Sequence, residues 1–200
     1  MTKHADEKAT RPTAEVCVLD HARRPVANSN AMYEYDATSL IGLRVIAHHA
    51  AVVTGSGEDE AVELPKLDEL MAAAAVMRCL MPERLRGHEV RAMRKILRMT
   101  LADLANSLDE KTAVETVSRW ESEAQPMGGY AEKVLRLFIC SKLKDRAPGV
   151  NYDAEMIAYL KQVDPWRANP DYELPAIVLE LVRVKQPKGF VDDNWSAQAA

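Results

Sequence analysis

The stretch TVSRWESE, which begins at Thr116, combines hydroxyl side chains, an arginine and two glutamates around a single tryptophan. On a helix, Val117 and Trp120 are three residues apart and share a face, so they are expected to pack inward. Thr116, Ser118 and Arg119 then point outward. An arginine fork can donate two hydrogen bonds to guanine O6 and N7, and short hydroxyl groups can bond phosphates or bases. The stretch therefore predicts a surface that recognises a partner by hydrogen bonding.

Few other residues have the types and spacing of a reactive site. His48 and His49 are adjacent, and neighbouring residues on a strand point to opposite faces, so they are not expected to share a metal ion. Cys17, Cys79 and Cys140 are far apart without a C-x-x-C spacing, which predicts buried thiols and neither disulfides nor a zinc site. Phosphate-loop, G-x-S-x-G and H-E-x-x-H motifs are missing. We therefore expect no enzyme, no metal and no cofactor.

The hydropathy pattern predicts the elements that precede TVSRWESE. Residues 1–31 mix charge, proline and asparagine with little periodicity, which predicts a flexible arm, unless AEVCVLD forms a strand. Residues 32–82 predict a small α+β module and a possible dimerisation unit. Its β-hairpin would come from LIGLRVIAHHAAVVTG and EAVELP, and its helix from KLDELMAAAAVMRCLM, ending at Pro82.

Residues 83–146 predict four or five helices with short connections. The segment RGHEVRAMRKILRM leads to TLADLANSL, where Thr100 and Asp103 have the spacing of a capping box. The turn DEKTAV leads to ETVSRWESE, and YAEKVLRLFICSKLKDR forms a further helix after a break.

Residues 147–200 predict a C-terminal extension with a short helix near 154–163 and a strand in PAIVLELVRVKQP. The strand would pair with the early hairpin or with a second chain. Trp166 and Trp195 lie in loop-like surroundings, where we expect them to pack beneath loops or to anchor a partner.

The order of a capped helix, a turn and a helix containing V-S-R-W-E resembles the Xre/Cro family, also called lambda repressor-like, over residues 86–140. The family motif is met here by Arg94, Lys95, Leu97, Met99, Thr100, Asp103, Leu104, Ala105, Leu108, Thr116, Val117, Ser118, Arg119, Trp120 and Glu121. The connection from Leu108 to Thr116 is longer than the family's turn. Leu101 stands where many members carry a glutamine that contacts phosphate.

The resemblance implies a helix-turn-helix within an α+β, mainly α protein, and a face that binds double-stranded DNA. Thr100 and Lys111 would grip phosphates with the N-terminus of the second helix. Thr112 and Glu115 have N-cap to N3 spacing, so the third helix would start one residue early, with Ala113 and Val114 near its entrance. Glu121 would be structural and would hold Arg94 or a backbone N–H. The predicted DNA-binding residues are Thr100, Lys111, Thr112, Val114, Glu115, Thr116, Ser118 and Arg119.

The charge is distributed unevenly along the chain. The net charge is −4, yet residues 84–146 hold 13 Lys plus Arg against 9 Asp plus Glu, so this segment is basic and the remainder acidic. Arg91, Lys95 and Arg98 line one helical stripe, which would either follow phosphates or form a solvated face. The chain lacks an apolar run of about 18 residues and a hydrophobic secretion signal, so we expect a cytoplasmic protein without membrane contact.

These observations together predict a transcriptional regulator, a repressor that binds DNA as a homodimer, because one recognition helix reads too few bases. The alternative is an antitoxin that binds a toxin protein and represses its own operon. Residues before the motif are similar to those of MqsA-like antitoxins, although the cysteines that hold zinc there are absent. A third alternative is a helix-turn-helix that serves only as a packing unit.

Overall fold

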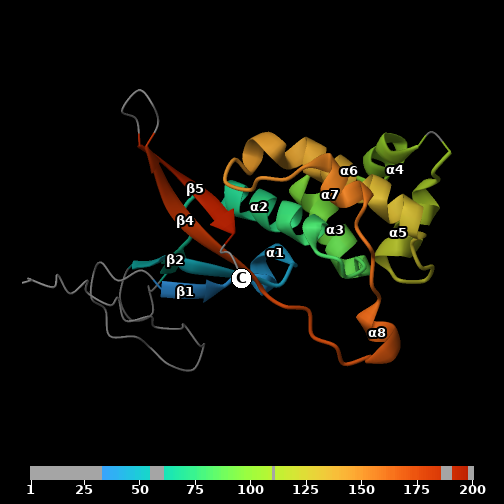
Figure 1. Cartoon of the computed structure of the whole chain (residues 1–200), viewed down its shortest axis with the longest axis horizontal. Helices are drawn as coiled ribbons and strands as arrows, with labels where there is room; N and C mark the ends of the chain where they lie inside the picture. The colour runs from blue at the N-terminus through green and yellow to red at the C-terminus, as the bar shows by residue number, and fades with distance from the viewer. Residues whose placement is uncertain (1–32, 55–60, 110, 186–190, 198–200) are drawn as a thin grey trace, which may run out of the picture.

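A computed structural model describes residues 33–54, 61–109, 111–185 and 191–197. A sheet lies at one end of this part and most helices lie at the other (Figure 1). The strands are β1 (Tyr33–Asp36), β2 (Val45–Thr54), β3 (Ala61–Glu63), β4 (Ile177–Lys185) and β5 (Val191–Ala197). The helices are α1 (Thr38–Ile41), α2 (Leu67–Leu80), α3 (Gly87–Ile96), α4 (Leu101–Leu108), α5 (Val114–Glu121), α6 (Gly129–Leu143), α7 (Ala154–Ala158) and α8 (Pro165–Ala168). The predicted mixture of helices and strands is confirmed.

The sheet has the order β1-β2-β4-β5, and β3 pairs with the far end of β2. β1 and β2 are antiparallel, as are β4 and β5, whereas β2 and β4 are parallel, with Val45 opposite Ile177. The predicted hairpin is confirmed, because β3 runs antiparallel to β2 with Thr54 opposite Ala61.

The N-terminal and C-terminal segments of the described chain share this sheet. β4 is the predicted C-terminal strand, and it pairs with β2 of the same chain. The extension also contains α8 and β5, which the sequence pattern does not predict. Trp195, expected beneath a loop, lies on β5, where its side chain is buried and its Nε1 donates to the Pro65 carbonyl at 3.2 Å.

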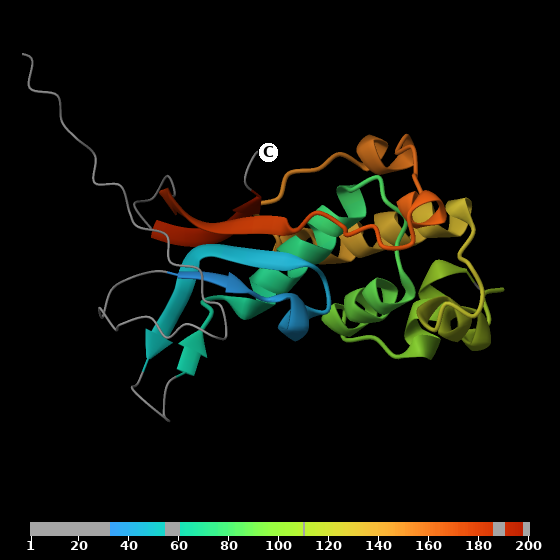
Figure 2. The ribbon, with the colours of Figure 1, turned by 90° about the horizontal axis from the view of Figure 1, so that it is seen from below.

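α2 is the central helix of the core. Its four consecutive alanines, residues 72–75, are fully buried, as is Leu70. A helix that is apolar all round must be covered on all sides. α2 meets this requirement by contacting β4 and β5 of the sheet as well as α3 and α6 (Figure 2). The small alanine side chains allow these neighbours to approach its backbone closely.

Two fully buried arginines fix the segment that follows α2. Arg78 donates to both carboxylate oxygens of Glu89, at 2.5 and 2.8 Å, and to the Glu83 carbonyl at 2.9 Å. Arg136 of α6 donates to Glu132 and to carbonyl groups around the end of α2, including that of Met81 at 2.6 Å. Paired carboxylates and backbone acceptors are what a buried guanidinium requires. The basic residues here serve the packing of α2, α3 and α6.

Cys79 and Cys140 are buried free thiols, as predicted. The pKa of the Cys79 thiol is raised well above its ordinary value, mainly by burial and to a smaller extent by a hydrogen bond with Cys140. Cys17 and the predicted arm of residues 1–31 lie outside the described residues. No helix in the described ranges is both long and apolar enough to cross a bilayer.

Candidate nucleic-acid interface

α4 and α5 lie at the end of the molecule that is distant from the sheet (Figure 1). α5 contacts α3 and α4, and the side chain of Val117 is fully buried between them and the rest of the core. Leu104 of α4 is buried on the same core, and Trp120 packs against it while partly exposed. Val117 and Trp120 therefore face inward, as the sequence predicted.

α4 begins with the predicted capping box. The Thr100 hydroxyl accepts a hydrogen bond from the Asp103 N–H at 3.1 Å, and the Asp103 carboxylate accepts one from the Thr100 N–H at 2.9 Å. The Thr100 hydroxyl also donates to Asp103 at 2.7 Å. Hydrogen bonds from Thr100 lower the pKa of Asp103. Because this hydroxyl is already engaged, a phosphate at this point would be held by the backbone N–H groups of α4.

α5 starts early, with Ala113 and Val114 at its entrance as predicted, but its cap differs from the prediction. Its N-cap is Ala113, which has no side-chain hydrogen bond, so the predicted cap at Thr112 is wrong. Asp109 organises the preceding turn instead: its carboxylate accepts from the Lys111 N–H at 3.3 Å and its carbonyl accepts from the Thr112 N–H at 3.0 Å. Aspartate commonly forms such turns with the backbone two residues on. The longer connection is therefore folded around Asp109, and α5 starts at Val114.

The C-terminal end of α5 is held by Glu121, as the sequence predicted. This carboxylate is buried and accepts from Arg94 at 2.6 and 3.0 Å and from Arg91 at 3.3 Å. Arg94 also donates to the Met99 carbonyl at 2.9 Å, which lies just before α4. The hydrogen bond with Glu121 raises the pKa of Arg94. A single arginine thus joins α3, α5 and the approach to α4.

A second anchor of α5 was not predicted from the sequence. A Cβ atom on Gly87, at the start of α3, would lie 2.6 Å from the carbonyl oxygens of both Trp120 and Glu121. Only glycine permits this approach. Glu123 accepts from the Gly87 N–H at 2.9 Å and from Arg86 at 2.9 and 2.8 Å, and the hydrogen bond from Arg86 lowers the pKa of Glu123. No periodicity marks this contact, because it joins residues distant in sequence.

The outer face of α5 carries most of the predicted DNA-binding residues. Exposed side chains on α5 and the turn before it are those of Lys111, Ala113, Val114, Glu115, Ser118 and Arg119. Thr112 and Thr116 are half-buried, and Thr100 is exposed at the start of α4. Within the described ranges, Lys111 and Arg119 form no ion pair. Their charges are therefore available to a partner, and Glu115 adds one negative charge beside them.

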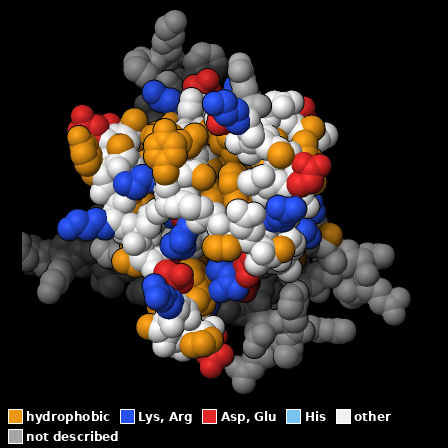
Figure 3. Space-filling model, turned by 90° about the vertical axis from the view of Figure 1, so that its right-hand side faces the viewer, with side chains coloured by type: hydrophobic (Ala, Val, Ile, Leu, Met, Phe, Trp, Pro, Cys, Tyr) orange, Lys and Arg blue, Asp and Glu red, His pale blue; other side chains and the backbone are white. Residues whose placement is uncertain are grey.

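Most arginines of the basic segment, residues 84–146, form salt bridges within the protein. Salt bridges join Arg84–Glu132, Arg86–Glu123, Arg91–Glu121, Arg94–Glu121, Arg98–Asp68, Arg136–Glu132 and Arg146–Asp68. In the stripe of Arg91, Lys95 and Arg98, only Lys95 has no ion pair among the described residues. On the end of the molecule that faces the viewer in Figure 3, basic and acidic side chains are interspersed with apolar ones. This surface is mixed in charge, so its electrostatic pull on a polyanion is modest.

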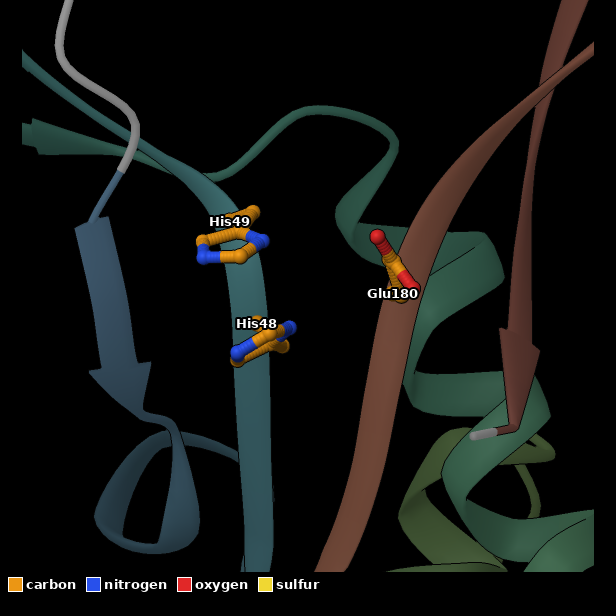
Figure 4. Close-up of side chains that lie close together, drawn as sticks. All are labelled: His48, His49 and Glu180. Carbon is orange, nitrogen blue, oxygen red and sulfur yellow. The ribbon is translucent and has the colours of Figure 1, made fainter. Parts of the chain in front are cut away.

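The adjacent histidines of β2 depart from strand alternation. The ring centroids of His48 and His49 are 3.7 Å apart, so the expectation that they point to opposite faces is wrong. The register with β1 shifts between Tyr33 and Tyr35, and His49 has a φ of 50°. A step of two residues on β1 therefore matches a step of four on β2, which is a β-bulge that turns the strand locally. The bulge brings the two imidazoles together (Figure 4).

Comparisons with protein-family models, with curated proteins and with solved structures found no match to this chain. The resemblance to the Xre/Cro family therefore rests on the residues of the sequence alone.

Proposed function

We propose that this protein is a sequence-specific regulator of transcription that binds double-stranded DNA, with α4 and α5 as its helix-turn-helix and α5 as the recognition helix. One observation carries the proposal. α5 is fixed on its inner side by Val117 and Glu121, while Ser118 and Arg119 on its outer side are exposed. A helix held in this way can place its outer residues in the major groove.

Arg119 is the residue best suited to read a base. Its guanidinium has no ion pair within the described chain, so no internal carboxylate must be displaced when it binds. Arginine forms two parallel hydrogen bonds with guanine O6 and N7. Ser118 can bond a base or a phosphate, and Lys111 and Lys95 supply exposed charges for phosphates.

The mixed charge of the surface sets the expected strength of binding. Because few cations are uncommitted, one protomer would neutralise about two to four phosphates, which gives a slope of log K against log salt of about −2 to −4. A single weak half-site of this kind requires a second copy. We therefore propose a homodimer that acts as a repressor, with its two α5 helices about 34 Å apart on adjacent turns of DNA.

To test this proposal, the full chain is used to select the duplexes that it binds from a library of random DNA sequences. Its affinity for the enriched site is then measured by titration. Arg119→Ala is expected to weaken binding by about 1–3 kcal/mol and to relax the preference at one base pair. Arg44→Ala is the matched control, because Arg44 is an exposed arginine beside the sheet whose surface pair with Glu173 contributes little.

The control is expected to bind as the unmodified chain does. Equal binding of all duplexes by Arg119→Ala and the unmodified chain would refute the role of α5. Absence of any salt-dependent binding would leave α4 and α5 as a packing unit.

An antitoxin that binds a toxin protein is a second candidate, and exposed apolar side chains on and after two contacting helices, α6 and α7, favour it. Tyr130 of α6 is 84% exposed, Tyr159 after α7 is 80% exposed and Met156 is 55% exposed. Lys133 joins the two helices by donating to the Ala158 carbonyl at 2.7 Å. Exposed apolar patches mark protein interfaces. If the product of an adjacent gene co-purifies with the chain, the double variant Tyr130→Ser/Tyr159→Ser should release it and leave DNA binding intact.

A further inference from the structure

We propose that His48, His49 and Glu180 bind a divalent transition-metal ion that ties the strands at the centre of the sheet together. One nitrogen of each imidazole and one oxygen of the Glu180 carboxylate lie within 4.8 Å of one another. The close-up shows both rings on β2 and the carboxylate on the neighbouring strand β4 (Figure 4). Two imidazoles and one carboxylate are a donor set that binds zinc in catalytic sites and iron in oxygenases.

The backbone creates this arrangement. His48 is opposite Glu180 in the parallel ladder of β2 and β4, at the last pair of that ladder. The bulge at His49 then places the second imidazole beside the first, at a centroid distance of 3.7 Å. Three donors are thus brought together by strand register and by one unusual φ. A chance meeting of long surface side chains would require neither this strand register nor the positive φ of His49.

The surroundings of the imidazoles suit metal binding. Glu34 of β1 lies 3.0 Å from the Nε2 atom of His48, so a carboxylate lies beside one nitrogen of this ring. A carboxylate on the second nitrogen orients the ring and strengthens the ligand in many metal sites. The Nε2 atom of His49 is buried and has no hydrogen-bond partner within the described chain. No contact at that nitrogen therefore fixes the tautomer, so His49 is free to present a lone pair to a cation.

Small side-chain movements would complete the coordination. A cation centred among donors 4.8 Å apart lies about 2.8 Å from each, whereas bonds from zinc to nitrogen or oxygen measure about 2.0–2.2 Å. Rotation of the imidazole and carboxylate side chains would shorten these distances. Three protein ligands leave a fourth position for water or for a group from a partner. The bound ion would connect β2 to β4 directly and β1 through Glu34.

Zinc titration of the full chain, followed calorimetrically, tests the proposal. The unmodified chain is expected to bind one zinc ion, and His49→Gln and Glu180→Gln are each expected to weaken binding at least tenfold. Cobalt, used as a spectroscopic probe, should give visible bands that both variants lose. Glu34→Gln should weaken zinc binding by about 10–100-fold through its effect on His48.

Two controls separate this site from other imidazoles. His88→Gln removes an exposed histidine on α3, and the double variant His4→Gln/His21→Gln removes the histidines that lie outside the described residues. Both are expected to bind zinc as the unmodified chain does.

Unchanged zinc affinity in both His49→Gln and Glu180→Gln would overturn the proposal, as would loss of the bound zinc in the His4/His21 variant. Circular dichroism of the metal-free variants verifies that they are folded. If either His49→Gln or Glu180→Gln is unfolded, His48→Gln replaces it in the comparison.

Discussion

Replacement of Glu121 by glutamine tests whether the buried carboxylate fixes α5. Glu121→Gln keeps the size of the side chain and removes its charge. In the protein this carboxylate is buried and accepts three hydrogen bonds, two of them from Arg94. Glutamine can accept with its one oxygen, but its NH₂ group would face a guanidinium, and two donors cannot bond each other.

The expected cost follows from the burial of the two partners. Breaking a fully buried ion pair by removing one charge costs about 3–5 kcal/mol. Arg94 is 14% exposed and keeps its bond to the Met99 carbonyl, so its charge remains partly compensated. We therefore expect Glu121→Gln to lower the free energy of unfolding by about 2–3 kcal/mol.

Glu123→Gln is the matched control, two residues further along. The Glu123 carboxylate is 42% exposed and its partner Arg86 is 37% exposed, so solvent screens the pair. Removing its charge should cost no more than about 1 kcal/mol. Urea unfolding monitored by tryptophan fluorescence measures both variants, and the proposed change is a lower midpoint with an unchanged m-value.

A double-mutant cycle with Arg94→Met isolates the coupling between the two side chains. We expect a coupling above about 1 kcal/mol for Glu121 and Arg94. Equal losses in the free energy of unfolding for Glu121→Gln and Glu123→Gln would refute the role of Glu121 in holding α5. Absence of the coupling with Arg94 would refute it as well.

Three further predictions concern other contacts of the fold. Gly87→Ala should destabilise the protein by about 1–3 kcal/mol in urea unfolding, because the new Cβ would meet the last carbonyl groups of α5. Gly128→Ala is the control: a Cβ there meets nothing within 4 Å, so the loss of stability should be smaller. Trp195→Ala should cost about 3–5 kcal/mol in the same assay, because this side chain is 1% exposed; a loss below 1 kcal/mol would contradict its burial. The pKa of the Asp103 carboxyl is lowered below its ordinary value of 3.8, so its contribution to stability is present above pH 3.8 and disappears as the pH falls through the folded-state pKa. The stability difference between Asp103→Ala and the unmodified chain should therefore narrow in urea titrations below pH 3.8, and a constant difference would exclude this linkage.

The sequence predicted the elements whose signals are local. The spacing of Thr100 and Asp103 indicated where α4 starts, and the pattern around Val117 indicated the buried side of α5. The cap predicted at Thr112 was wrong because Asp109 forms the hydrogen bonds of that turn, and Ala113 becomes the N-cap of α5.

Contacts between distant residues were harder to predict. β5 has the sequence VDDNWSA, which lacks the alternation of a half-buried strand, and it is a strand because β4 offers a long edge for pairing. The approach of Gly87 to α5 and the clustering of His48 and His49 depend on tertiary packing and on a bulge. The rule of alternation assumes a regular strand, so it gave the wrong orientation for the two histidines.

The parallel pairing of β2 with β4 has a consequence for synthesis of the chain. Val45 lies opposite Ile177, so nearly the whole described chain must leave the ribosome before the middle of the sheet can form. Pairing between such distant segments is slow, and until it occurs the face of α2 that will contact β4 and β5 stays open to proteases and chaperones. In a nascent chain stalled before β4, this face of α2 would therefore lack the strands that cover it in the complete fold.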